Sequence, residues 1–339
     1  MKNHRVVVSR YGGPDVLQVV EEDLPEPGSG EVRVRVLAAG VSAYDLMLRS
    51  RSFPGNPRPP FTPGEDIVGV VDKLGEGVST VEPGQKVAGW TFGDGGGYAE
   101  FICRPASQVV PVPSGLDSAE AVCMVVNYLT AHLYLHRTAG MQSGERVLVH
   151  GAAGGLGTAL LQLGEQAGLE MYGTASKHNH ELVSALGATP IDYRTEDFVE
   201  RIRSLTGEGV DAVFDLVSGA RQLWRSYRTL RKGGRLVPMG SVATAEAGMK
   251  VIPLSLMTVV LLKLIPDGRR VPLSPNMMKF PQTHNAWYRE TLTELLDSAA
   301  GGKIKPVVAE RIPLAEAARA HELLERSGHA GKVVLATST

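Results

Sequence analysis

The sequence predicts an α/β protein in which a doubly wound parallel sheet is combined with a second, β-rich domain. At 339 residues the chain exceeds the usual size of one hydrophobic core, so two domains that share a cleft are expected. Residues 1–120 are rich in Gly and Pro and carry short β-branched runs, which are typical of short strands. Between residues 146 and 240, apolar strand-like segments alternate with helical patterns, as in a parallel sheet covered by helices.

The expected elements can be placed in chain order. The β-rich part should contain strands at residues 5–8, 31–38, 67–74 and 86–88. The alternating part should contain strands at 146–149, 170–173, 211–214 and 235–238, with helices beginning near Gly155, His178, Glu196 and Gly219. After Gly240 repeated prolines interrupt the pattern. The last elements expected are a helix at 287–300, a strand at 305–309, a helix at 314–327 and a strand at 332–335 that could return to the first domain.

Composition narrows the class of function. Hydrophobic residues make up 43% of the chain, enough to bury a core, and the formal net charge of -1 argues against a nucleic-acid binder. Cys103 and Cys123 are isolated, so neither a disulfide framework nor a cysteine-rich metal lobe is expected, and a cytoplasmic location is predicted. The longest apolar run, residues 254–265, is too short to span a bilayer, and the first residues do not resemble a secretory signal.

The most informative segment is a glycine-rich turn between a strand and a helix. Residues 146–157 read RVLVHGAAGGLG and lead into an apolar-periodic helical segment. Glycines allow the backbone to approach a pyrophosphate closely, and the free N–H groups at the start of the helix stabilise its charge. A plain turn between strand and helix would carry a glycine motif less often in this context. The segment therefore predicts a dinucleotide site.

The residues after the second strand of this domain indicate which dinucleotide. A site for NAD places Asp or Glu about 20 residues beyond the turn, where it holds the ribose 2′-hydroxyl. Here the chain has Ser176 and Lys177 instead. A hydroxyl and a cation suit a 2′-phosphate, so NADPH is predicted. The alternative is that Lys177 is a solvated lysine at the start of a helix.

At these residues the chain resembles the medium-chain dehydrogenase/reductase superfamily, in particular the zeta-crystallin-like quinone oxidoreductases and their vesicle amine transport protein relatives. The resemblance covers nearly the whole chain. Its segments are YGGPDVL at 11–17, PGEDIVG at 63–69, NYLTA at 127–131, AAGGLG at 152–157, LGA at 186–188 with IDY at 191–193, and GKVV at 331–334.

The resemblance implies a GroES-like catalytic domain formed by both chain ends, a Rossmann domain between them, and usually a homodimer. The implied division is 1–122 for the first part of the catalytic domain, 123–265 for the NADPH-binding Rossmann domain, and 266–339 for the return to the catalytic domain. The apolar region 254–265 is expected at the dimer interface. Segment 268–281, with Met277, Met278 and Phe280, is expected to form either a substrate lid or part of that interface.

Carried over by motif, the resemblance also assigns cofactor contacts. Asn127 and Thr130 would lie near the nicotinamide ribose, although both could equally be local helix caps. The pyrophosphate would meet Ala153, Gly154, Gly155 and Leu156; the adenosine phosphate end would meet Ser176, Lys177 and Tyr193; and the nicotinamide ribose would approach Gly240, Ser241 and Val242.

The resemblance further implies a reaction without zinc. The zinc alcohol dehydrogenases of this superfamily carry a Cys and then a Gly-His-Glu in the catalytic domain, together with a four-cysteine lobe. The matching segments here are 40–45, with Ser42 at the Cys position, and 63–66, which contains no His. Zinc prefers thiolate and imidazole ligands, so no metal site is predicted. This favours conjugate reduction of a small apolar quinone or enone over oxidation of an alcohol.

Conjugate reduction needs a hydrogen-bond donor for the enolate oxygen. Tyr44 is the first candidate and Ser42 the second. The alternative is that Tyr44 packs in the domain interface while solvent supplies the proton. Two other functions remain open from the sequence: a pathway-specific enoyl reductase of biosynthesis, with the same cofactor residues, and a non-catalytic NADPH-binding structural or regulatory protein.

Overall fold

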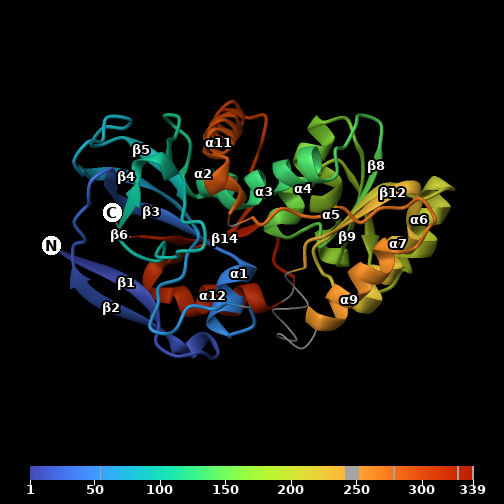
Figure 1. Ribbon diagram of the computed structural model, residues 1–339, viewed down its shortest axis with the longest axis horizontal. Coiled ribbons are helices and arrows are strands. Elements are labelled where there is room, and N and C mark those ends of the chain that lie inside the picture. Colours follow the sequence, from blue (N-terminus) through green and yellow to red (C-terminus); the bar gives the residue numbers. More distant parts are fainter. Residues whose placement is uncertain (54, 241–251, 278, 327, 338–339) are drawn as a thin grey trace.

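The computed structural model of the chain describes residues 1–53, 55–240, 252–277, 279–326 and 328–337. Two larger sheets lie side by side, with α2 (Ser118–Cys123) and α3 (Leu129–His132) between them (Figure 1). The first sheet has the strand order β13-β14-β3-β4-β5-β7, and the second has the order β10-β9-β8-β11-β12. The α/β fold class predicted from the sequence is therefore confirmed.

The mainly antiparallel first sheet is built largely from the N-terminal third of the chain. Its strands from this part are β3 (Glu31–Val41), β4 (Asp66–Leu74), β5 (Lys86–Trp90), β6 (Phe101–Pro105) and β7 (Val109–Pro111), while β1 (Lys2–Val8) and β2 (Leu17–Asp23) form a separate hairpin. Short helix α1 (Ala43–Arg49) follows β3 directly. The sequence analysis missed β2, β6 and β7.

The second sheet is wholly parallel and covered by helices. Its strands are β8 (Arg146–His150), β9 (Glu170–Ala175), β10 (Ala188–Asp192), β11 (Val210–Asp215) and β12 (Leu230–Pro238). The helices between them are α4 (Gly155–Gln166), α5 (His180–Ala185), α6 (Phe198–Thr206) and α7 (Ala220–Arg228). The strand list from the sequence lacked β10, because Pro190 lies in it. Pro is tolerated there because β10 is an edge strand.

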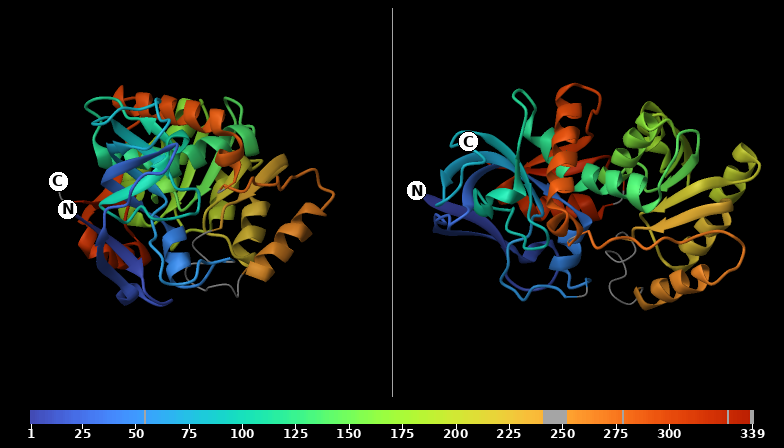
Figure 2. Two further views of the ribbon diagram at one scale, coloured as in Figure 1. Left: turned by 60° about the vertical axis from the view of Figure 1, so that its left-hand side comes forward. Right: turned by 45° about the horizontal axis from the view of Figure 1, so that its top comes forward.

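The C-terminal part of the chain returns to the first sheet. Strand β14 (Lys332–Ala336) pairs antiparallel with β3, and β13 (Val308–Pro313) pairs parallel with β14. In Figure 2 this red segment rejoins the blue N-terminal strands, and α12 (Ala317–Glu325) packs beside them. The expected strand at 305–309 begins later than predicted, at Val308, and the expected helix at 314–327 begins with a 3-10 turn and ends at Glu325.

Three described helices lie between β12 and β13, and the short α10 (Phe280–Thr283) among them contacts α11. Helix α11 (Asn285–Ala300) packs against α2 and α3, close to its predicted range. Helix α9 (Ile252–Lys263) packs on α7 but leaves large apolar side chains exposed, among them Leu256 and Val260. No described helix is long and apolar enough to cross a membrane.

Candidate active site

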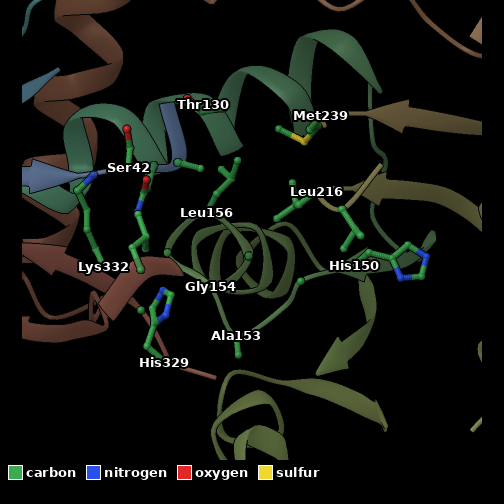
Figure 3. Close-up of a pocket in the computed structure, with 18 of the residues that line it drawn as sticks. Ser42, Thr130, His150, Ala153, Gly154, Leu156, Leu216, Met239, His329 and Lys332 are labelled. Carbon is green, nitrogen blue, oxygen red and sulfur yellow. The ribbon is translucent and has the colours of Figure 1, made fainter. Parts of the chain in front are cut away.

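A cleft of about 1020 Å³ lies between the two sheets. Its walls come from both parts of the fold: from β3 and α1 of the first sheet, from the helical stretch around α3, and from the carboxyl ends of the parallel strands. Figure 3 looks into this cleft along α4, with Gly154 and Ala153 near the centre and Lys332 and His150 on opposite sides. Ligands of doubly wound sheets bind at this edge, because the strand ends there leave backbone groups free.

The glycine turn after β8 forms the middle of the cleft. Gly154 is the N-cap of α4. The N–H groups of the first helical turn have no partner within the helix and are free to bind a ligand in the cleft. A Cβ at Gly157 would collide with the carbonyl oxygen of Gly151, so only glycine lets the helix pack this tightly against the turn. A Cβ at Gly155 would collide with the amide of Asn127. The turn is therefore shaped for close approach of a charged group.

Ten of the residues selected from the sequence line this cleft. Asn127 and Thr130 are largely buried, and neither is at the N-cap of the helix that contains it, so they do not act as helix caps. The residues brought together are Ser42, Tyr44, Asn127, Thr130, Ala153, Gly154, Gly155, Leu156, Ser176 and Tyr193.

Of the other four selected residues, the two that the structure describes are not among those that line the cleft. Lys177 is exposed at the start of a 3-10 turn and is outside the residues that line the cleft. Gly240 directly follows the cleft residue Met239. Ser241 and Val242 lie outside the described residues. The roles expected of all these residues remain predictions.

Near Ser176 the cleft is closed by a contact between the two parts of the fold. Ser176 is buried at the end of β9, and Tyr193 follows β10 with 49% of its surface exposed. His178 Nε2 lies 2.8 Å from the carbonyl oxygen of Gly328, in the loop before β14. At this end, therefore, a segment from the C-terminal return covers the strand ends of the parallel sheet.

At the opposite end, α1 begins with a reciprocal cap. The Ser42 hydroxyl donates to Asp45 Oδ2 over 2.7 Å, and the backbone N–H groups of Ser42 and Gly64 also donate to the Asp45 carboxylate. Burial raises the pKa of Asp45 to about 6, although these hydrogen bonds oppose the rise. Because the Ser42 hydroxyl already donates to Asp45, it is less available than Tyr44 to donate to a ligand.

Tyr44 lines the same end of the cleft. Its ring packs edge-on against Phe53, with ring centroids 5.0 Å apart. Burial, and then the charge of Glu65, raise the pKa of Tyr44 to about 12. The phenol therefore stays protonated and can donate a hydrogen bond at neutral pH. Packing against Phe53 and lining the cleft are both features of this side chain.

The sequence analysis did not select several residues that line the cleft, including Glu65, Leu216, Met239, His329 and Lys332. Lys332 Nζ lies 2.7 Å from Asp66 Oδ2, and both side chains are almost fully buried. The contact is an ion pair rather than an aligned hydrogen bond. A Cβ at Gly40 would collide with both partners, so Gly40 makes room for the pair. Glu65 and Lys332 fall inside the family segments quoted above, which was the available signal.

Comparison with known proteins places this architecture in a family. The model for the alcohol dehydrogenase GroES-like domain matches residues 28–114, and the model for zinc-binding dehydrogenase matches residues 186–335. The quinone oxidoreductase of Rattus norvegicus is 30% identical over 97% of this chain and 96% of its own length. The chain belongs to the medium-chain dehydrogenase/reductase superfamily.

Further similarities place this medium-chain protein in the branch of quinone oxidoreductases and VAT-1 homologues. The synaptic vesicle membrane protein VAT-1 homolog of Danio rerio is 32% identical over 98% of this chain and 69% of its own length. The solved structure of a mycobacterial protein complexed with NADPH has a TM-score of 0.85 and 31% identity, covering 98% of this chain and 99% of that one. Among the described residues of this medium-chain protein, no group of three or more His, Cys, Asp or Glu is arranged to hold a metal.

Proposed function

We propose that the chain is an NADPH-dependent oxidoreductase that transfers hydride, without zinc, to a quinone or an α,β-unsaturated carbonyl compound. The observation that carries this proposal is the cleft itself. One cleft joins a glycine turn at a helix N-terminus to a buried pocket with hydrogen-bonding side chains, as hydride transfer from a dinucleotide requires. Membership of the quinone oxidoreductase branch supports the same class of reaction.

The residues present fit a dinucleotide. His150 is buried at the end of β8, and its Nε2 has no hydrogen-bond partner among the described residues, although the residue lines the cleft. Burial lowers the pKa of His150, so the ring is neutral and can bond to an uncharged polar group. Ala153, Gly154, Gly155 and Leu156 would hold the pyrophosphate, whose charge suits the start of α4.

The choice of NADPH over NADH rests on the end of the cleft near Ser176. Ser176 and Tyr193 line the cleft there, and no carboxylate occupies the position after β9 that would repel a 2′-phosphate. Lys177 is exposed beside Ser176, and its ammonium group has no hydrogen bond or ion pair with the described residues. It is therefore available to bind the phosphate. The nicotinamide ribose would lie against Asn127, Thr130 and the segment that begins at Gly240.

The bound nicotinamide supplies the hydride. The chain orients the acceptor and stabilises the oxygen that becomes negatively charged, and Tyr44 is the proposed hydrogen-bond donor. Ser42 is the weaker candidate, because its hydroxyl already donates to Asp45. Large, mainly apolar side chains that line the cleft include Met47, Trp90, Tyr134, Met239 and Met277. They suit a flat, apolar acceptor and exclude water from the reacting atoms.

We further propose a cytoplasmic homodimer in which the exposed side chains of α9 are covered by the second copy. The apolar face that α9 leaves exposed supports this arrangement, because large apolar patches on folded proteins usually mark interfaces. Sedimentation over a range of protein concentrations tests the assembly. A monomer at every concentration would refute it.

The function is tested by following NADPH oxidation with a panel of quinones, alkenals and enoyl thioesters. Turnover of quinones or alkenals supports the proposal, and turnover confined to enoyl thioesters would identify a biosynthetic enoyl reductase instead. Tight NADPH binding without oxidation by any acceptor would favour a non-catalytic binding protein.

A further inference from the structure

We propose that Glu65 is the acid that protonates the reduced substrate, a step that rests on the reductase function proposed above. The inference concerns a residue that the sequence analysis did not select. It deepens the proposed reaction, because it names the source of the proton that must accompany the hydride.

The backbone of Glu65 is held by a hydrogen bond from Thr91 and by the conformation of Gly64 before it. Its backbone carbonyl accepts from the N–H of Thr91 over 2.7 Å, and Gly64 before it has a φ of 103°, a conformation that favours glycine. A Cβ at Gly64 would crowd the ring and backbone of Tyr98. The chain therefore turns at Gly64 and holds Glu65 directly before β4, among the residues that line the cleft.

The two carboxyl oxygens of Glu65 have different surroundings. Oε2 accepts from the backbone N–H of Gly93 over 2.7 Å and from the Thr91 hydroxyl over 3.1 Å. Oε1 is buried and has no hydrogen-bond partner among the described residues. A buried oxygen without a partner is costly in a structural role, because its lost hydration is not replaced. Glu65 and Tyr44 both line the cleft, and we infer that the free oxygen of Glu65 is the one that acts on a ligand bound there.

The surroundings of this carboxyl favour its protonated form at pH values where an ordinary glutamate is ionised. Only 1% of Glu65 is exposed, and burial is the main cause that raises its pKa to about 7. The nearby charges of Asp45 and Asp66 raise this pKa further. The hydrogen bonds from Gly93 and Thr91 oppose that rise. An acid works best in catalysis when its pKa lies near the working pH.

The charged and titratable groups around Glu65 come from several elements. Asp45 and Tyr44 belong to α1, and the Asp66 carboxylate at the start of β4 is paired with Lys332 of β14. Asp66 therefore faces Glu65 as a member of a buried ion pair, and its charge is partly offset by Lys332. Two further groups on this side are Tyr98, whose pKa is raised by burial, and Arg104, which donates to the carbonyl oxygen of Thr91.

The proposed step balances atoms and charge. Addition of hydride to the β-carbon of an enone moves the π electrons toward the carbonyl oxygen and gives an enolate. The O–H bond of Glu65 then breaks, and its proton forms a new C–H bond at the α-carbon, leaving Glu65 as a carboxylate. Water returns a proton to Glu65 after product release. Tyr44 remains the hydrogen-bond donor to the enolate oxygen, since a phenol with a pKa of about 12 is the weaker acid.

Glu65→Gln tests this role, because the amide can keep the contact with Gly93 but cannot supply an acidic proton. With an enone substrate, kcat should fall by about 100-fold or more, which is the range usual for loss of a general acid. Affinity for NADPH, measured by fluorescence titration, should change little. Asp94→Asn is a matched control, because Asp94 lies in the neighbouring loop, is mostly exposed and does not line the cleft.

The pH profile separates a catalytic role from a structural one. For the wild type, kcat/KM should decline as pH rises through about 7, because the carboxyl loses the proton that it must donate. Glu65→Gln should abolish that limb, whereas Glu65→Asp should retain a declining limb at lower activity. If Glu65→Gln does not fold, the wild-type and Glu65→Asp profiles still decide the matter.

The outcomes for Glu65 and for the reductase function can be told apart. A wild type that oxidises NADPH with enones but shows no decline near pH 7, or a Glu65→Gln variant with unchanged kcat, would overturn the role of Glu65 alone. A wild type that turns over no acceptor would overturn the proposed function itself.

Discussion

The two ends of the cleft differ in how they control charge. At the end near Ser42, the carboxyl groups of Asp45 and Glu65 are almost fully buried, and burial raises their pKa values. At the end near Ser176, Lys177, the side chain proposed to bind the phosphate, is exposed. Burial favours neutral groups and therefore proton transfer, whereas exposure keeps a cation charged and suits recognition of a phosphate. The end near Ser42 would thus serve proton transfer, and the end near Ser176 would serve the choice between NADPH and NADH.

The turn that joins the two ends should be the most sensitive point. In Gly157→Ala, the added methyl would collide with the backbone of Gly151, which cannot move without distorting the turn. We expect loss of NADPH binding by more than about 100-fold, equivalent to about 3 kcal/mol, together with a lower Tm. In Gly154→Ala the nearest protein atom lies 3.5 Å from the new methyl, so NADPH binding should weaken while Tm is preserved. Calorimetric titration and thermal melts measure both effects, and equal losses in Tm would contradict this reading.

The buried acid end should carry a stability penalty that depends on pH. Below an ordinary glutamate pKa of 4.5, the residue is protonated in both the folded and the unfolded chain. As pH rises toward about 7, the unfolded chain releases a proton that folded Glu65 retains, so stability is lost, and above that pH the loss is complete. Relative to the wild type, Glu65→Gln should therefore gain up to about 3 kcal/mol at pH 8 but little at pH 4.5. Denaturant unfolding at both pH values measures the difference, and a variant equally destabilised at both would indicate a structural role.

At the exposed end, Lys177→Glu should change cofactor choice. Loss of a charge-assisted contact with phosphate costs roughly 1.5–3 kcal/mol, or about one to two powers of ten in affinity for NADPH. Affinity for NADH should be nearly unchanged, because the altered side chain faces only the 2′ position. Titration of both cofactors against wild type, Lys177→Glu and the control Lys303→Glu measures this. Equal losses for both cofactors, or a wild-type preference for NADH, would show that the phosphate is recognised elsewhere.

The smallest effect is expected from metal removal. Ser42 binds Asp45 within the cap of α1, and no metal-binding group of side chains occurs in the described part of the chain. Exhaustive chelation should therefore leave reductase activity unchanged. Activity that disappears on chelation and returns with zinc would contradict the metal-free reaction.

The same contrast explains what the sequence could predict. The phosphate turn is local, since strand, glycines and helix follow one another in 146–166, and the structure has them as expected. The residues at the end near Ser42 come from segments that are far apart in the sequence. The burial of Glu65 depends on Thr91 and Gly93, which lie more than twenty residues away, and no pattern near Glu65 reports that contact. Strand β10 was missed for a related reason, because only its position at the sheet edge makes Pro190 acceptable.

The central claim is that one cleft brings hydride from NADPH and an exchangeable proton to two neighbouring carbons of the same acceptor. Reduction of an enone with NADPH deuterated at the transferable position of the nicotinamide tests it most directly, with the product analysed by NMR. The account predicts one deuterium at the β-carbon and ordinary hydrogen at the α-carbon, and the reverse labelling when the reaction is run in D₂O with unlabelled NADPH. A product that carries no label from the cofactor would contradict the account.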